Sequence, residues 1–286
     1  MPAGPPDPTA WPARALLPWG DQLVPRIVGT VTGASSEPDA LTAVDPLDDD
    51  RRTALRRAAI RANLAPSFED SQPWRLRLRT GELDILGDGD RWRPFLDPDG
   101  RGLAMSIGAA LMNARCALHS AQESHLVERP TPASFNDRYA VVRVEPGKDL
   151  AWDEVLAGLD EMTTQLRLPD DASRRTGGPS PSLMQALQRA AAEEECTVSS
   201  QPPAGYALST ALLVSAAGDG PTNWVRVGEA LQRMRLQAAA TGWGAAVEAP
   251  ADPAEMSGAV LRLGPAGRSA ITRHRPLAVV LAEEPS

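Results

Sequence analysis

The residues with the clearest capacity to bind a small ligand lie between Ala65 and Trp74, in the segment APSFEDSQPW. Its two prolines fix φ, and its two serine hydroxyls are able to hold backbone or ligand oxygens. A helical pattern precedes the segment and an alternating strand pattern follows it. The segment is therefore expected to form a turn from a helix into a strand, with Trp74 at the start of the strand.

The same segment resembles the APSxxNxQPW signature of the nitroreductase superfamily. Residues 96–101 (LDPDGR) and 106–113 (SIGAALMN) resemble the DPxGRxxxxSxGAALxN stretch of the Acg-like branch of that superfamily. Residues 223–233 (NWVRVGEALQR) are similar to the WLRAGEALxR helix of this branch, and residues 273–277 (RHRPL) to the basic segment before its last strand. The resemblance spans roughly residues 50 to 282 and is weak between 125 and 205.

This resemblance implies an FMN-dependent oxidoreductase, with the flavin at the junction of two nitroreductase-like lobes within one chain. It implies a small molecule or biosynthetic intermediate as substrate and NAD(P)H as a candidate electron donor. Because the isoalloxazine of such a flavoprotein carries out the redox step, no residue is assigned a catalytic role. Arg273 and Arg275 are expected to face the FMN phosphate, since a guanidinium group donates two parallel hydrogen bonds. The residues that match the cofactor site of the family are Pro66, Ser67, Asp70, Gln72, Trp74, Arg167, Arg273 and Arg275.

Two features depart from the family pattern. Glu69 and Asp70 stand where branch members have His-Asn, which removes amide donors and adds negative charge beside an electron-rich ligand. The second-lobe motif RxTNRRPF keeps one clear arginine, Arg167, for which Arg174 or Arg175 could substitute. These departures leave a second interpretation open. In it the protein is flavin-free and uses the same crevice for a partner or another ligand, or as a flavin-independent enzyme.

Hydrophobic periodicity places these motifs on a mixture of helices and strands. In the first half we expect helices over 51–64, 103–118 and 152–162, a β-hairpin over 74–86 that turns at Thr80-Gly81, and a strand over 139–144. In the second half we expect helices over 182–194 and 224–238, the latter ending at Gly242, and strands over 207–216, 259–263 and 277–281. With the family resemblance, this pattern predicts an α+β, nitroreductase-like fold in which two pseudo-repeated lobes pack helices on antiparallel sheets.

Composition separates the N-terminal residues 1–47 from the rest of the chain. They are rich in Pro, Gly, Ser and Asp, which predicts an irregular arm. The nitroreductase-like domain is then expected over 48–286, with a first lobe over about 48–145 and a second over about 146–286. Because two lobes of one chain would imitate the usual homodimer, both a monomer and a homodimer are compatible with the sequence.

Bulk properties exclude several classes of function. The 286 residues are 42% hydrophobic and 23% charged, as in an ordinary soluble globular protein. A formal net charge of −8 disfavours nucleic acid as a partner, and Lys148, the only lysine, lies in no P-loop. No apolar run is long enough to span a bilayer, and two cysteines fit a reducing compartment better than a disulfide scaffold. We therefore expect a cytoplasmic protein without a membrane or nucleic-acid partner.

The remaining candidates for chemistry are better explained by packing or solvation. Cys116 and His119 share one helix but lack the further ligands of a zinc site, so no metal site is expected. Trp224 and Trp243 are expected to be core residues. The acidic run Glu193–Glu195 is expected to be a solvated helix end.

Overall fold

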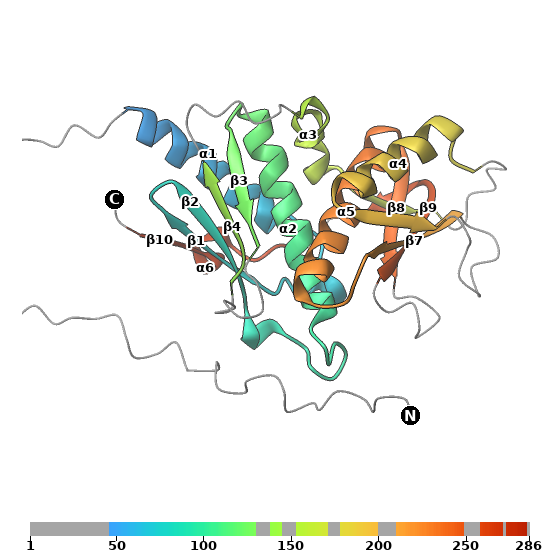
Figure 1. Cartoon of the computed structure of the whole chain (residues 1–286), viewed down its shortest axis with the longest axis horizontal. Helices are drawn as coiled ribbons and strands as arrows, with labels where there is room; N and C mark the ends of the chain where they lie inside the picture. The colour runs from blue at the N-terminus through green and yellow to red at the C-terminus, as the bar shows by residue number, and fades with distance from the viewer. Residues whose placement is uncertain are drawn as a thin grey trace, which may run out of the picture. The chain divides into compact units, whose positions relative to one another are not determined.

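A computed structural model of the chain describes residues 46–129, 138–144, 153–170, 178–199, 210–248, 258–270 and 273–284 (Figure 1). Internal packing divides the chain into Met1–Pro46 and Leu47–Ser286, and the described residues lie almost wholly in the second unit. The irregular arm expected over 1–47 therefore lies outside the described residues, apart from the start of the first helix.

The first half of the second unit contains two long helices and an antiparallel sheet. The helices are α1 (Pro46–Asn63) and α2 (Arg101–Ser120), and the strands are β1 (Trp74–Arg79), β2 (Glu82–Gly87), β3 (His125–Glu128) and β4 (Arg138–Val144). The strands pair in the order β1-β2-β4-β3. In β1 the side chains of Trp74, Leu76 and Leu78 are buried and the arginines between them are more exposed, which confirms the predicted alternation and hairpin.

The second half repeats this order of elements. It consists of α4 (Pro181–Glu193), β6 (Cys196–Ser199), β7 (Thr210–Ala216), α5 (Pro221–Ala240), β8 (Trp243–Glu248) and β9 (Gly258–Ser269). The strands pair antiparallel in the order β6-β7-β9-β8, which is the order β1-β2-β4-β3 of the first sheet. The sequence helix, two strands, helix, two strands thus occurs twice, with the same sheet topology.

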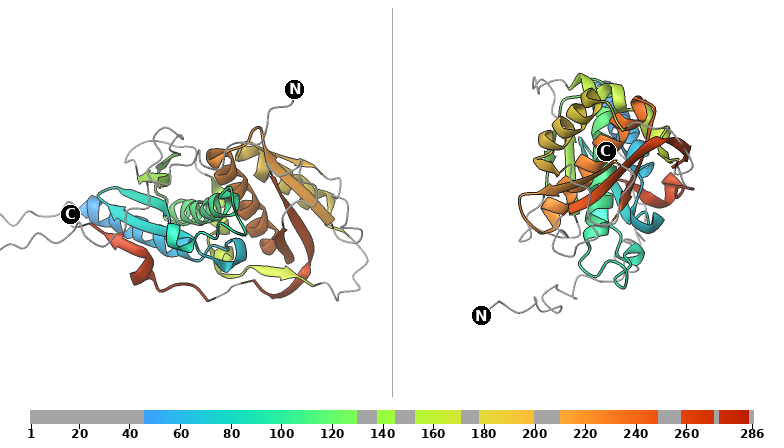
Figure 2. Two further views of the ribbon diagram at one scale, coloured as in Figure 1. Left: turned by 90° about the horizontal axis from the view of Figure 1, so that it is seen from below. Right: turned by 90° about the vertical axis from the view of Figure 1, so that its right-hand side faces the viewer.

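Two short strands tie the sheets together. β10 (Leu281–Glu283), near the end of the chain, leaves the second half and pairs in parallel with β1 of the first sheet (Figure 2). β5 (Arg167–Pro169) follows α3 (Glu154–Leu159) in the connection between the halves and pairs antiparallel with β9 of the second sheet. The sheet of each half is therefore completed by chain from outside that half.

The helices α2 and α5 cross between the two sheets (Figure 1). Gly108 of α2 lies against α5 so closely that an added Cβ would stand 2.1 Å from Val225 O. Gly228 of α5 makes the matching approach, since its Cβ would stand 2.1 Å from Met105 O. Only glycine permits two helix backbones to approach this closely.

Each half has its own buried core, and a third cluster joins them. The first core packs α1 and α2 on the first sheet, and the second packs α4 and α5 on the second sheet. The third cluster holds Met112 and Cys116 of α2, Leu156 and Leu159 of α3, and Leu236 of α5, with Leu166. Trp224 is buried in the first core and Trp243 packs against the second, so the expectation that both tryptophans are packing residues is confirmed. No helix in the described part of the chain combines the length and the hydropathy that a bilayer crossing requires.

The structure differs from the predicted elements in several places. The strand expected over 277–281 is wrong, because Leu277–Val280 forms the short helix α6 and only Leu281 enters β10. Pro276, with φ of −56°, precedes this helix, and a short apolar run fits a helix as well as a strand. The strands β3, β5, β6 and β8 were not predicted, since three to six residues carry little periodicity. Helix α1 begins at Pro46, so the aspartates at 48–50 lie within its first turns.

Candidate functional site

The turn between α1 and β1 has an unusual backbone. Glu69, Asp70 and Gln72 have φ of 50°, 51° and 47°, a left-handed region that residues other than glycine rarely adopt. Ser67 Oγ accepts a hydrogen bond from Gln72 N at 2.9 Å, which closes the turn across these residues. Strained backbone persists only where its surroundings fix it, and it is concentrated in ligand-binding segments.

The turn is fastened to the N-terminal part of α2. Phe68 N donates a hydrogen bond to Ser106 Oγ at 2.9 Å. The helix N-terminus itself is closed by Asp97, whose Oδ1 and Oδ2 accept from Gly102 N and Leu103 N, both at 2.9 Å. Because a carboxylate of the protein already satisfies these N–H groups, the N-terminus of α2 offers no open anion site.

Gln72 joins the turn to the C-terminal segment. Its side chain is 3% exposed, and its Nε2 donates to Arg273 O at 3.0 Å while its Oε1 accepts from Arg275 N at 2.8 Å. The Nε2 also lies 3.3 Å from Asp70 Oδ1. The structure thus brings together two predicted parts of the cofactor site that lie at opposite ends of the sequence.

Arg275 is already engaged by the protein. Its Nη1 donates to Gln72 O at 3.2 Å and to Trp74 O at 3.1 Å, and it lies 3.2 Å from Asp88 Oδ2. These contacts direct the guanidinium group toward the turn and the start of β1. Arg275 therefore holds the turn in place, and a ligand would have to share it with three protein oxygens.

Arg273 is more available than Arg275. The Arg273 side chain is exposed and makes no hydrogen bond or ion pair with any described residue. Both ring nitrogens of His274 are buried and form no well-aligned hydrogen bond with a described residue, although the backbone of Asn63 lies close enough to act on the ring. Burial lowers the pKa of His274, against the opposing effect of the Asp70 carboxylate. Arg273, whose side chain has no partner among the described residues, is the group of this segment best placed to bind a phosphate or another anion.

The remaining residues of the predicted turn differ in burial. Trp74 is completely buried, and its Nε1 donates to Asn63 Oδ1 at 3.2 Å. Asn63 Nδ2 in turn donates to Arg275 O at 2.8 Å, so this pair supports the C-terminal segment. Pro66 is half-buried, whereas Glu69 and Asp70 are exposed and place two negative charges at the rim.

Arg167 is not brought to the turn by any described contact. It lies on β5, at the edge of the second sheet, where its side chain is exposed. Arg174 and Arg175, which could substitute for it, lie outside the described residues. The assignment of Arg167 to the cofactor site remains a prediction.

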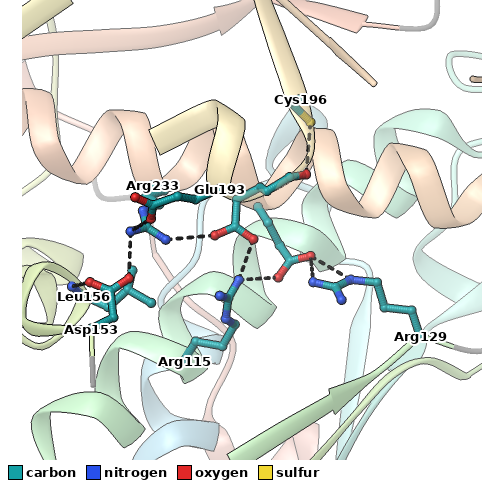
Figure 3. Close-up of polar contacts among 9 residues, drawn as sticks. Arg115, Arg129, Asp153, Leu156, Glu193, Cys196 and Arg233 are labelled. Atoms are coloured by element: carbon teal, nitrogen blue, oxygen red, sulfur yellow. Dashed lines mark hydrogen bonds and ion pairs between the residues drawn. The ribbon is translucent and has the colours of Figure 1, made fainter. Parts of the chain in front are cut away.

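A second polar cluster lies between the halves and was not predicted from the sequence (Figure 3). Arg115 of α2 donates to Glu194 at 2.6 Å and to Glu229 of α5 at 2.8 Å. Arg129 Nε donates to the same Glu229 at 2.9 Å. Burial raises the pKa of Glu229 in spite of these arginines. Burial alone would lower the pKa of Arg115, but attraction to the two glutamates raises it overall.

Arg233 extends this cluster to the connection between the halves. It donates to Glu194 at 3.0 Å and to Asp153 at 2.7 Å, and it also contacts Glu193 (Figure 3). Glu194 is only 4% exposed, so the expectation of a solvated helix end over Glu193–Glu195 is wrong at its central residue. The run of three glutamates looked solvated because its partners lie on α2 and α5, far away in the sequence.

A cavity of about 340 Å³ opens beside this cluster. His119 and His125 form an edge-to-face pair in its wall, with ring centroids 4.9 Å apart. Burial lowers the pKa of His125 to about 4, so its ring is neutral near pH 7. The other lining residues are Arg115, Gln122, Glu123, Ser124, Leu126, Val127, Arg129, Glu193, Glu194, Glu195 and Arg226. None of them belongs to the turn 65–74, so cavity and turn are separate features.

Metal chemistry finds no support in the described part of the chain. No three side chains of His, Cys, Asp or Glu there lie close enough together to hold an ion. Cys116 is completely buried, and burial raises the pKa of its thiol to about 12. This thiol is a packing group of the third core cluster.

Comparison with known proteins gives partial matches. No protein-family model matches the sequence. Two proteins of Mycobacterium tuberculosis, from strains CDC 1551 / Oshkosh and ATCC 25618 / H37Rv, are both named "Putative NAD(P)H nitroreductase", and each is 33% identical over 109 residues. The chain is similar to these nitroreductases over 38% of its length. The match spans only 30% of the length of each mycobacterial protein.

A third similar protein has a name that states no activity. A UPF0102 protein of Rhizobium leguminosarum bv. trifolii (strain WSM2304) is 31% identical over 111 residues, which is 35% of this chain and 91% of that protein. The mycobacterial matches support a relation to the nitroreductase superfamily. The two sheets and six α-helices in the described part of the chain are compatible with the expected α+β fold.

Proposed function

We propose that the chain is a nitroreductase-like oxidoreductase that binds FMN where the turn 65–74 meets the segment 273–275. The observation that carries this proposal is the pair of hydrogen bonds from Gln72 to the backbone of Arg273 and Arg275. It joins the two segments that match the flavin site of the family. The similarity to proteins named as NAD(P)H nitroreductases supports NAD(P)H as electron donor and a small molecule as acceptor.

The residues present fit FMN best at its phosphate end. Arg273 is exposed without a described partner, whereas the ring nitrogens of the adjacent His274 are buried next to the Asn63 backbone. A phosphate would pair with the Arg273 guanidinium group. Ser67 and Gln72 hold the backbone of the turn, and Arg275 fixes the segment on which Arg273 stands. When bound, FMN supplies the hydride or electron transfer, and the chain supplies the position and the charge around it.

An FMN titration of two arginine variants tests this proposal. Arg273→Ala should weaken FMN binding by roughly tenfold or more, because charge-assisted hydrogen bonds contribute about 1.5–3 kcal/mol. Arg189→Ala is the matched control, since Arg189 is an exposed arginine on α4 in the other half. Binding can be followed by quenching of flavin fluorescence. Equal FMN affinity of both variants would remove Arg273 from the phosphate site.

A flavin-free protein is the alternative that a specific observation favours. Glu69 and Asp70 are exposed at the rim of the turn, where their charges oppose an anionic cofactor. If they exclude FMN, the double variant Glu69→His and Asp70→Asn should raise FMN affinity above that of the wild type. Asn tolerates the left-handed φ of position 70, so the turn should keep its conformation. No gain in affinity would show that these two side chains do not exclude the flavin.

The repeated topology supports a single chain that supplies both halves of the site. In this proposal the monomer imitates a nitroreductase dimer, with α2 and α5 as the central helices and β10 as the strand that returns to the first sheet. Light scattering of the purified protein at the concentration used for FMN titration would test it. A dimeric mass with FMN bound at one equivalent per two chains would contradict a self-sufficient monomer.

A further inference from the structure

Arg235 is a buried cation without an ion-pair partner in the part of the chain that the structure describes. Its side chain on α5 is 8% exposed, and its Nε lacks a hydrogen-bond partner. Among the described residues no carboxylate forms an ion pair with it. Burial alone accounts for the lowering of its pKa to about 10. A buried charge without a counter-charge is costly, and such a group in a native protein calls for an explanation.

The repeat of the fold provides a direct comparison. Arg115 and Arg235 are both the fifteenth residue of a twenty-residue helix, and these helices cross at glycines that are both the eighth residue. Arg115, as described above, has two carboxylates within 3 Å, from Glu194 and Glu229. Two arginines at the same position of equivalent helices thus have opposite surroundings.

The repeat shows which residues of the first half are equivalent to Glu194 and Glu229, the two partners of Arg115. The buried residues of α4 and of the position after it have the same spacing as buried residues of α1. They are Leu187, Ala190, Ala191 and Glu194 in the second half, and Leu55, Ala58, Ala59 and Ala62 in the first. Glu194 therefore corresponds to Ala62. Glu229, the ninth residue of α5, corresponds to Ala109, the ninth residue of α2. The two glutamates that pair with Arg115 thus have alanines, Ala62 and Ala109, as their counterparts in the other half.

We propose that Arg235 binds the anionic group of a small-molecule substrate, a carboxylate or a phosphate, at the junction of the halves. This inference rests on the proposed function, which places the ligand beside the turn 65–74. Ala62, the counterpart of Glu194, precedes that turn by only three residues. Two alanines in place of two glutamates leave Arg235 without the counter-charge that Arg115 has, and an incoming anion would supply it. Arg273 faces the cofactor phosphate in this account, so Arg235 is left for the substrate.

Thermal unfolding in the presence of simple anions tests the proposal. The probes are sodium benzoate for a carboxylate and inorganic phosphate for a phosphate, each at constant ionic strength set with sodium chloride. The wild type should show a saturable rise in Tm with one of them, which distinguishes the two sources of the anion. In Arg235→Met the affinity for that anion should fall roughly tenfold or more, as expected for loss of a charge-assisted hydrogen bond. Arg189→Met, on the exposed face of α4, should respond like the wild type.

The Tm of Arg235→Met without added anion is a second readout, and here the substitution should stabilise the protein. Without anion, Arg235→Met should unfold at a higher temperature than the wild type, because it removes an unpaired buried charge. A lower Tm, or a variant that does not fold, would mean that Arg235 has a structural partner in solution and would overturn the proposal. A wild type that responds to neither probe, or an equal response in Arg235→Met, would overturn it too.

FMN titration of the same variant separates this inference from the proposed function. FMN affinity should be unchanged in Arg235→Met if the residue serves the substrate. A wild type that ignores FMN but responds to an anion through Arg235 would contradict the flavin assignment and leave the anion site in place. Loss of FMN binding in Arg235→Met with an intact anion response would assign Arg235 to the cofactor and overturn its assignment to the substrate.

Discussion

Gly108 and Gly228 occupy the same position in two helices of equal length, and each lies against the backbone of the other helix. The contact is the central point of the repeated fold, since α2 belongs to the first half and α5 to the second. It sets how the two halves meet. The turn 65–74, the cluster around Glu194 and Glu229, and Arg235 all depend on that arrangement.

Substitution of Gly108 by alanine should destabilise the protein strongly. The new Cβ would stand 2.1 Å from Val225 O, so the two helices would have to separate. Overpacking of this kind costs about 1–3 kcal/mol, and contact with backbone places the expected loss near the upper end. Gly158→Ala in α3 is the control, because nothing lies within 4 Å of its Cβ and alanine favours the helix. Urea unfolding that shows equal stability for both variants would contradict the close crossing.

The buried glutamate Glu194 should matter far more to stability than its neighbour. Glu194→Gln leaves Arg115 and Arg233 short of counter-charge, and breaking one partner of a buried ion pair costs about 3–5 kcal/mol. Glu195→Gln removes a charge whose side chain is 67% exposed and paired with Arg226, where the expected loss is below about 1 kcal/mol. Chemical denaturation measures both. Equal losses would mean that the cluster is solvated in solution.

Gln72→Glu should loosen the C-terminal segment from the turn. The substitution keeps the shape and the acceptor for Arg275 N but replaces the donor to Arg273 O by a carboxylate oxygen. A buried carbonyl left facing that oxygen costs about 1–3 kcal/mol. Gln165→Glu, at an exposed position after the 3-10 helix Glu161–Thr164, should be neutral. Hydrogen exchange should rise at residues 273–275 only in the first variant, and unchanged exchange there would exclude Gln72 as the link.

His125 should make stability depend on pH below neutrality. Its pKa is lowered by burial from 6.5 to about 4 in the folded protein, so the unfolded chain takes up a proton first as the pH falls. The stabilising effect of the neutral ring is complete above pH 6.5 and is lost as the pH falls toward 4, by about 3 kcal/mol at most. His125→Gln should flatten that part of the stability profile. An unchanged slope between these pH values would show that His125 is solvated.

Local patterns in the sequence were sufficient for the long helices and for the strands β1, β2 and β4. The alternation of Trp74, Leu76 and Leu78 with arginines predicted β1 and its hairpin, and the apolar stripe from Leu103 to Leu118 predicted α2. The family resemblance predicted that the turn 65–74 and the segment 273–275 belong to one flavin site; Gln72 joins the two segments, and their role in binding flavin stays a prediction. These features are visible in sequence because each depends on residues within one element or on a motif of fixed spacing.

Features that depend on contacts between distant elements could not be predicted in this way. Glu194 sits in a run of three glutamates that is typical of a solvated helix end, yet Arg115 and Arg233 come to it from two other helices. Arg235 resembles any helical arginine until its burial and its counterpart Arg115 are known. Such residues become recognisable only once the fold places one half beside the other.

The visible absorption spectrum of the purified protein, recorded before and after addition of FMN and then of NADH or NADPH, tests the central claim most directly. The account predicts flavin bands that remain with the protein after gel filtration and that bleach when the nicotinamide donor is added. A protein that stays colourless, and from which all added FMN separates on the column, would contradict the assignment of the turn 65–74 and the segment 273–275 to a flavin site.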